Sequence, residues 1–226
     1  MRRSRETLES ICGRRVIGFR APSFSIVPGL EWALEILLQE GYGYDSSLFP
    51  ITRRGYGYPR AGRDPYWINC PTGTLIEMPP ATLRRFGMNL PAAGGGYLRL
   101  LPLGLMRSAI DATERRNAPA TLYIHPWEID PDQPRLNVSL KTRIRHYGGL
   151  DRTMARLSAI LGSYPFRPVA DTYARVLLVE VRDWSGHRDP TPRLRQVGVD
   201  RLPLVVEDAE TTDALLARLT NGESAR

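Results

Sequence analysis

The sequence has few of the residues that most often build metal sites and disulfide frameworks. Its 226 residues include three histidines and two cysteines, Cys12 and Cys70. Two cysteines form one pair at most, so no disulfide framework is implied and isolated buried thiols are expected. His146 and His187 lie far from any partner with metal-ligand spacing. The sequence therefore predicts no metal site within this chain.

Long apolar segments are also missing. No stretch approaches the length that a membrane span requires. The N-terminal residues 1–6 lack the apolar region of a secretory signal, so we expect no membrane span and a cytoplasmic location. With 42% hydrophobic residues, the chain can form one domain with a sizeable core, with or without an appendage.

The net charge of +7 raises the question of an anionic partner. Lys141 is the single lysine, and the arginines are scattered apart from short clusters such as Arg84-Arg85 and Arg115-Arg116. No basic run interleaved with aromatics and no nucleic-acid-binding motif is present. We therefore expect no nucleic-acid partner and keep that function only as an alternative.

The first third of the chain has the pattern of an α/β fold. Residues 16–19 and 42–44 have the character of short strands, and residues 28–38 place leucines on one face of a helix between them. A further helix is expected over residues 4–11, ended by Gly13. A strand, a helix and a second strand in this order predict a parallel sheet with right-handed crossovers and flanking helices.

The remaining helices, strands and loops are predicted from the same kinds of sequence pattern. Residues 49–73 show no period and are expected to form a long loop, and a second loop is expected before Gly94. The predicted strands lie at 74–78, 121–124, 164–169 and 176–181, and the predicted helices at 101–115, 151–161 and 212–219. Beyond residue 170 the charge balance becomes negative, with eight arginines against ten acidic residues. We therefore divide the chain into a domain of residues 1–170 and an appendage of unknown role, residues 171–226.

One stretch is the strongest candidate for chemistry. The apolar residues 121–124 stop at His125-Pro126, because proline lacks the N–H that a central strand needs. α/β sheets and barrels place their reacting groups at strand ends of this kind. Two interpretations stay open at this point: a catalytic histidine, or a packed or surface histidine that closes the strand.

Several short motifs resemble those of the polysaccharide deacetylases, the carbohydrate deacetylase family with the chitooligosaccharide deacetylase homology domain. The motifs are Gly18-Phe-Arg-Ala-Pro22, Tyr44-Asp-Ser-Ser47 and Tyr123-Ile-His-Pro126. Arg20–Ser25, Asn89–Gly96, His125–Asp130 and Arg145–Tyr147 resemble more closely a bacterial branch associated with exosortase systems and exopolysaccharide. The resemblance runs over about residues 4–170, and the order and spacing of the motifs make their combination specific.

The resemblance implies a fold and a reaction. The fold is an irregular (β/α)7 barrel, of which this chain would be the C-terminal portion. The reaction is metal-dependent hydrolysis of an acetyl group on a polysaccharide. By resemblance, His125 is the acid that protonates the leaving amine, Arg20 orients the catalytic carboxylate, and Asp45 holds His125 in its charged form.

The resemblance also indicates residues that contact substrate. The position of Tyr123 is usually a leucine that lines the acetate pocket. Trp127 follows the catalytic motif, and Trp67 lies among the tyrosines of residues 49–73, where aromatic rings would suit a sugar-binding wall. The alternative for the aromatic residues of this loop is that they fold back and cover the core.

The metal half of the family's site is missing from the motifs. The family binds a divalent, zinc-like metal through an aspartate and two histidines, supplied by an Asp-Asp pair and a His-x-x-x-His motif that this chain lacks. We therefore expect a truncated deacetylase with little or no activity of its own. The alternative is a non-catalytic carbohydrate-binding or interaction module. A partial barrel would leave sheet edges uncovered, which predicts self-association.

Overall fold

The computed structural model describes residues 1–53, 55–173, 178–183 and 195–196. The chain divides into two compact units. Residues 1–79 and 168–226 form the first, here called the sheet unit, and residues 80–167 form the second, here called the helical unit. The predicted α/β class, with parallel strands and flanking helices, is confirmed. The described strands do not close into a barrel.

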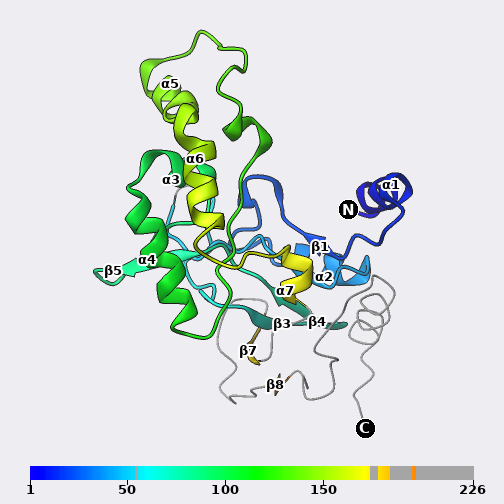
Figure 1. Ribbon diagram of the computed structural model, residues 1–226. Coiled ribbons are helices and arrows are strands. Elements are labelled where there is room, and N and C mark those ends of the chain that lie inside the picture. The colour runs from blue at the N-terminus through cyan, green and yellow to red at the C-terminus, as the bar shows by residue number, and fades with distance from the viewer. Residues whose placement is uncertain (54, 174–177, 184–194, 197–226) are drawn as a thin grey trace. The chain divides into compact units, whose positions relative to one another are not determined.

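The sheet unit contains one mixed sheet with the strand order β1-β2-β4-β3-β7-β8 (Figure 1). β1 and β2 are parallel and α2 lies between them in sequence, so the predicted strand–helix–strand unit is confirmed. β2 pairs with β4 in parallel, and β4 pairs with β3 in antiparallel fashion. The elements are α1 (Arg2–Cys12), β1 (Gly18–Phe19), η1 (Pro22–Phe24), α2 (Trp32–Gln39), β2 (Tyr44–Asp45), β3 (Tyr66–Cys70), β4 (Gly73–Glu77), α7 (Val169–Tyr173), β7 (Leu178–Asp183) and β8 (Arg195–Gln196).

Two helices of this unit begin or end as local chemistry requires. α1 ends at Gly13, whose φ of 64° gives the left-handed cap that the sequence predicts. α2 begins at Trp32, four residues later than predicted from Pro28. Gly29 has a φ of 96°, and Leu30 donates its N–H to the carbonyl of Val27. Pro28 and Gly29 therefore form the centre of a β-turn with a left-handed third residue, which cannot continue a helix.

The prediction of a long loop at residues 49–73 is wrong for the second half of this range, where β3 and β4 form a hairpin. Tyr66, Trp67 and Ile68 are all buried. A strand that is buried on both faces shows no alternation of apolar and polar residues. For this reason no strand pattern could be detected for β3 in the sequence. Trp67 is 8% exposed and packs with Ile17 and other buried residues in a hydrophobic core cluster.

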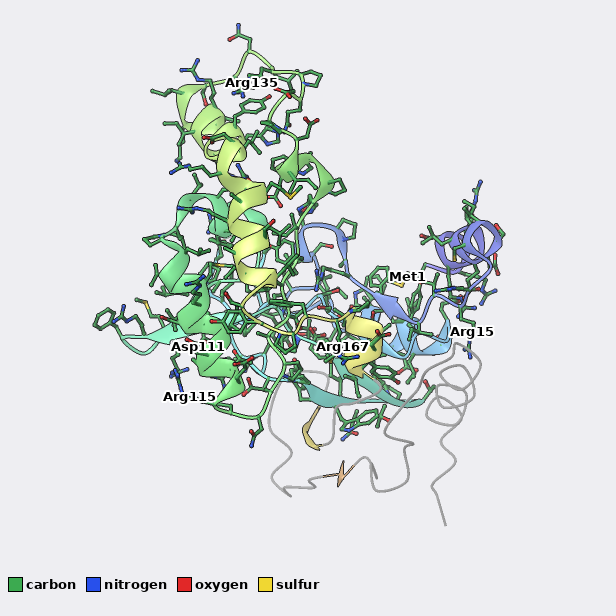
Figure 2. All side chains as sticks on the ribbon, viewed as in Figure 1. Met1, Arg15, Asp111, Arg115, Arg135 and Arg167 are labelled. Carbon is green, nitrogen blue, oxygen red and sulfur yellow. The ribbon has the colours of Figure 1, made fainter. Side chains whose placement is uncertain are left out.

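The helical unit has a hydrophobic core of its own. Its elements are β5 (Thr82–Arg85), β6 (Met88–Pro91), α3 (Gly95–Leu100), α4 (Leu103–Glu114), η2 (Pro126–Ile129), α5 (Leu140–Tyr147) and α6 (Leu150–Leu161). α4 and α6 lie side by side in Figure 1, and Met106, Ile110 and Ile160 from these helices are at most 2% exposed. Tyr164 joins the end of α6 to α4 by donating its hydroxyl to Asp111, which is labelled in Figure 2. The helices predicted at 101–115 and 151–161 are confirmed.

The hairpin of β5 and β6 was not predicted. Its two-residue turn is Phe86-Gly87, and both residues have positive φ, 49° and 75°. Such a turn favours Asn-Gly or Asp-Gly. Because phenylalanine occupies its first position here, the usual sequence signal for the turn is missing.

Two predicted strands differ from the structure. The segment 121–124 makes only isolated parallel bridges, Thr121 with Pro80 and Tyr123 with Gly94. Because two separate stretches of chain flank it, no continuous ladder forms. The strand predicted at 164–169 is absent, and Pro165 and Pro168 lack the N–H groups that a strand would use.

The predicted appendage, residues 171–226, is described only in part. β7 overlaps the strand predicted at 176–181. The helix predicted at 212–219 lies outside the described residues. Among the helices that the structure describes, none has the length and apolar character needed to cross a membrane.

Candidate functional site

His125 lies at the start of η2 in the helical unit, between two aromatic side chains of its own segment. Pro126 occupies the first position of this short helix and favours its backbone conformation. The His125 ring stands edge-on to Tyr123 at 5.8 Å and lies 6.1 Å from the ring of Trp127. Its side chain is 56% exposed, so one histidine, two aromatic rings and solvent meet here.

Trp127 connects η2 to α5 and α3. The ring of His146 stacks on it with centroids 4.4 Å apart and an interplanar angle of 12°. The guanidinium of Arg99 lies over the Trp127 ring at 5.2 Å, a cation–π arrangement. Nearby, Arg135 of the preceding loop, labelled in Figure 2, lies over the ring of Tyr147 at 5.1 Å. The cluster is therefore rich in aromatic rings and cations.

The carboxylate that contacts the ring of His125 belongs to Glu128, a residue to which the sequence motifs assigned no role. Glu128 is 3% exposed. One carboxylate oxygen, Oε2, accepts the backbone N–H of His125 at 3.0 Å and lies 3.2 Å from Nδ1 of the same residue. The other oxygen, Oε1, lies 3.3 Å from Nη2 of Arg99. Gly95 leaves the space that the carboxylate occupies, because a Cβ at this position would overlap it.

Arg99 contacts both Glu128 and Trp127 and so fixes their positions. It is 2% exposed, and its Nη1 donates to the carbonyls of His146 and Gly148, each at 2.9 Å. One side chain of α3 thus contacts η2, through Glu128 and Trp127, and the end of α5. A buried cation in this position requires a buried anion, and Glu128 supplies it.

An apolar cavity of about 170 Å³ in the same unit has Tyr123 in its wall. Its lining includes Leu122, Ile124, Leu157 and Phe166. Tyr123 contributes to both the cavity wall and the aromatic cluster. Nothing in the lining is charged, so the cavity offers volume rather than acid–base chemistry.

Arg20 and Asp45 lie in the sheet unit, at the ends of the neighbouring strands β1 and β2. Arg20 donates from Nε to the carbonyl of Ser46 at 3.0 Å and from Nη2 to its hydroxyl at 2.6 Å. Asp45 is fully buried and accepts hydrogen bonds from the hydroxyl and the backbone N–H of Ser47, at 2.6 and 3.1 Å. The register of β2 and β4 places Asp45 beside Glu77.

Asp45 and Glu77 form a buried carboxyl pair. Burial raises the pKa of Glu77 well above its usual value, and the charge of Asp45 raises it further. Burial also raises the pKa of Asp45, while hydrogen bonds from Ser47 oppose the rise. Oε1 of Glu77 accepts the N–H of Leu48, and Oε2 has no hydrogen-bond partner among the described residues. The raised pKa favours the protonated form of the Glu77 carboxyl beside Asp45.

The structure thus distributes the six predicted site residues over three places. Tyr123, His125 and Trp127 form one cluster in the helical unit. Arg20 and Asp45 are neighbours in the sheet unit, and Trp67 packs in the core of that unit.

The carboxylates Glu128 and Glu77 and the cation Arg99 were missed. The spacing His125-x-x-Glu128, with proline directly after the histidine, was the available signal for Glu128. It places the two side chains on the same side of one helical turn. Glu77 and Arg99 gave no comparable signal, because each acquires its partner only through tertiary contacts.

The described residues do not fit the divalent metal that the resemblance implies. Among the residues that the structure describes, no three His, Cys, Asp or Glu side chains lie close enough together to hold a metal ion. Glu128 and Asp45, the best oxygen donors by chemistry, are each buried and already hydrogen-bonded. No step of the chemistry below is therefore assigned to a metal.

Comparison with protein families gives one match. A family described as a domain of unknown function (DUF3473) matches residues 46–174, which are more than half of the chain and include the His125 cluster. Neither the curated proteins nor the solved structures contain a match.

Proposed function

We propose a function for this chain, which belongs to the DUF3473 family of domains of unknown function, from the geometry around His125. The chain is a polysaccharide deacetylase-type hydrolase that acts on an acetylated polysaccharide and supplies the proton-donating half of the site. One observation carries the proposal: a half-exposed histidine, held at Nδ1 by a buried carboxylate, stands beside two aromatic rings. The motifs that resemble those of the exopolysaccharide-associated deacetylases support it, and the (β/α)7 barrel that they imply is part of the same proposal.

The chemistry requires an acid at the position of His125. In the hydrolysis of an N-acetyl group, the oxygen of a water molecule bonds to the acetyl carbon. The bond from that carbon to nitrogen breaks, and its electron pair stays on the nitrogen, which takes a proton. The products are acetate and an amine. Histidine suits the proton transfer because its ordinary pKa lies near neutral pH.

Sugar binding should depend on Trp127 and not on an exposed tryptophan elsewhere. We expect Trp127→Ala to weaken binding of an N-acetylglucosamine pentamer by roughly tenfold or more, since one aromatic anchor is worth 1–2 kcal/mol or more. The cause is direct: the substitution removes the ring that lies beside His125 and supports His146. Calorimetric titration measures the affinity. Trp32→Ala is the matched control, because Trp32 is 54% exposed on α2. Equal affinities in the two variants would count against the site.

The alternative is a non-catalytic carbohydrate-binding module, favoured by the absence of a metal-binding cluster among the described residues. Acetate release separates the two functions. We expect the pentamer, with added zinc, to yield acetate only in traces, and we expect His125→Ala to abolish the trace while leaving affinity within about twofold. Binding without release, unchanged in the His125 variant, would favour the module. No binding at all would contradict both functions.

A further inference from the structure

We infer that Glu128 is the positioning residue of His125: it fixes the proton on Nδ1 and leaves Nε2 as the nitrogen that exchanges protons with a substrate. The catalytic meaning of this inference rests on the proposed function, but the tautomer itself does not. Nothing in the sequence motifs assigned this role to Glu128. By resemblance the partner of His125 was Asp45, and in the described residues the carboxylate that contacts the ring is Glu128.

Both oxygens of Glu128 are occupied in ways that keep the side chain in one position. Oε1 lies 3.3 Å from Nη2 of Arg99, and Oε2 accepts the backbone N–H of His125 at 3.0 Å. The side chain is 4% exposed, so water does not compete for these contacts. A side chain anchored at both oxygens presents a fixed acceptor to the imidazole, as the carboxylate partner of a catalytic histidine must.

Arg99 decides the direction of the hydrogen bond at Nδ1. A buried arginine remains charged, and its nearest anion is Glu128, so the carboxylate is held in its ionised form. An ionised carboxylate has no hydrogen to donate. At the 3.2 Å separation of Oε2 and Nδ1, the imidazole must therefore be the donor, which selects the Nδ1–H tautomer.

The other ring nitrogen is then the functional one. Nε2 of His125 makes no hydrogen bond to the protein in the part of the chain that the structure describes, and the side chain is 56% exposed. When the ring takes up a second proton, that proton sits on Nε2. The imidazolium then gives it to the nitrogen of the departing amine, and the ring returns to its Nδ1–H form with the contact to Glu128 intact.

A purely structural role for Glu128 predicts something different. Glu128 also caps the start of η2 by accepting the backbone N–H of His125. In the capping box the ring of His125 also accepts the backbone N–H of Glu128, a contact that the Nε2–H tautomer allows and the Nδ1–H tautomer does not. The tautomer of His125 therefore distinguishes a positioning residue from a capping residue.

The test is the tautomer of His125 in ¹⁵N-labelled protein, read from long-range ¹H–¹⁵N spectra at a pH where the ring is neutral. The chain has three histidines, and His125→Ala identifies the signal of interest. We expect the Nδ1–H form to predominate by roughly tenfold or more, because a hydrogen bond to a charged acceptor is stronger than one to a neutral acceptor. Predominance of the Nε2–H form would overturn the inference.

The decisive variant replaces both members of the buried pair. Removing Glu128 alone leaves Arg99 without an anion and endangers folding, whereas Arg99→Met with Glu128→Met fills similar volume with apolar side chains. We expect the preference for Nδ1–H to fall at least fivefold in this double variant. Glu114→Gln, an exposed glutamate on α4, is the control and should leave the ratio unchanged. An unchanged ratio in the double variant would overturn the inference. Failed sugar binding with the Nδ1–H form intact would contradict only the proposed function.

Discussion

Replacing Arg99 with methionine is expected to lower the free energy of unfolding by about 3–5 kcal/mol, the largest effect of any single substitution that we predict. The substitution leaves Glu128 ionised and 3% exposed, without its cation. It also removes the hydrogen bonds from Nη1 to the carbonyls of His146 and Gly148. Urea-induced unfolding, followed by tryptophan fluorescence and circular dichroism, measures the change.

A double-mutant cycle identifies the cause of that loss. If the uncompensated charge of Glu128 is responsible, then adding Glu128→Met to Arg99→Met should recover much of the stability. Arg143→Met is the control for the loss of an arginine, since Arg143 is exposed on α5, and it should change stability by less than about 0.5 kcal/mol. Equal stability of the single and double variants would show that Arg99 acts through its carbonyl contacts alone.

The second large effect concerns Glu77 and depends on pH. The pKa of Glu77 is raised in the folded chain by burial and by the neighbouring Asp45, whereas the ordinary value is 4.5. Above that value the unfolded chain has released the proton and the folded chain still holds it. The folded state therefore binds more protons, and stability falls as pH rises, until the pH passes the raised pKa.

Glu77→Gln removes this titration while preserving shape, because the amide NH₂ can donate to Asp45 as the protonated carboxyl does. Below pH 4.5 we expect wild type and variant to have similar stability. Above it, the wild type should lose up to about 1.4 kcal/mol per pH unit relative to the variant. Urea unfolding across a pH series measures the difference.

Glu6→Gln serves as the control for the charge change, because Glu6 is exposed on α1. Its stability should follow that of the wild type across the series. A wild-type curve parallel to that of Glu77→Gln above pH 4.5 would mean that the Glu77 carboxyl is ionised in the folded chain, and its protonated form beside Asp45 would be excluded.

Several elements could be predicted because their signals are local. The leucines of α2 recur at helical spacing, and Leu34 and Leu37 are fully buried as that spacing requires. Gly13 ends α1 because glycine adopts a left-handed backbone conformation at little energetic cost. Likewise, His125-Pro126 ends an extended segment because proline has no N–H. Each of these inferences depends on residues that are neighbours in the chain.

Other elements could not be predicted, because their signals depend on what packs against them. β3 is buried at Tyr66, Trp67 and Ile68, which erases the alternation that identifies a strand. The turn at Phe86-Gly87 uses a residue that such turns seldom contain. Burial explains the case of β3, whereas Phe86 is 90% exposed and is simply an unusual residue for its turn; in both cases the sequence pattern indicated a loop.

What the sequence by itself determined is the chemical character of this protein: an α/β chain with a histidine at the end of an extended segment and motifs resembling those of carbohydrate deacetylases. Only the tertiary structure decided which charges meet. Asp45 faces Glu77 across adjacent strands, and Glu128 meets Arg99 from 29 residues away. Partners of this kind are selected by burial, because a charge removed from water must find a counter-charge or share a proton.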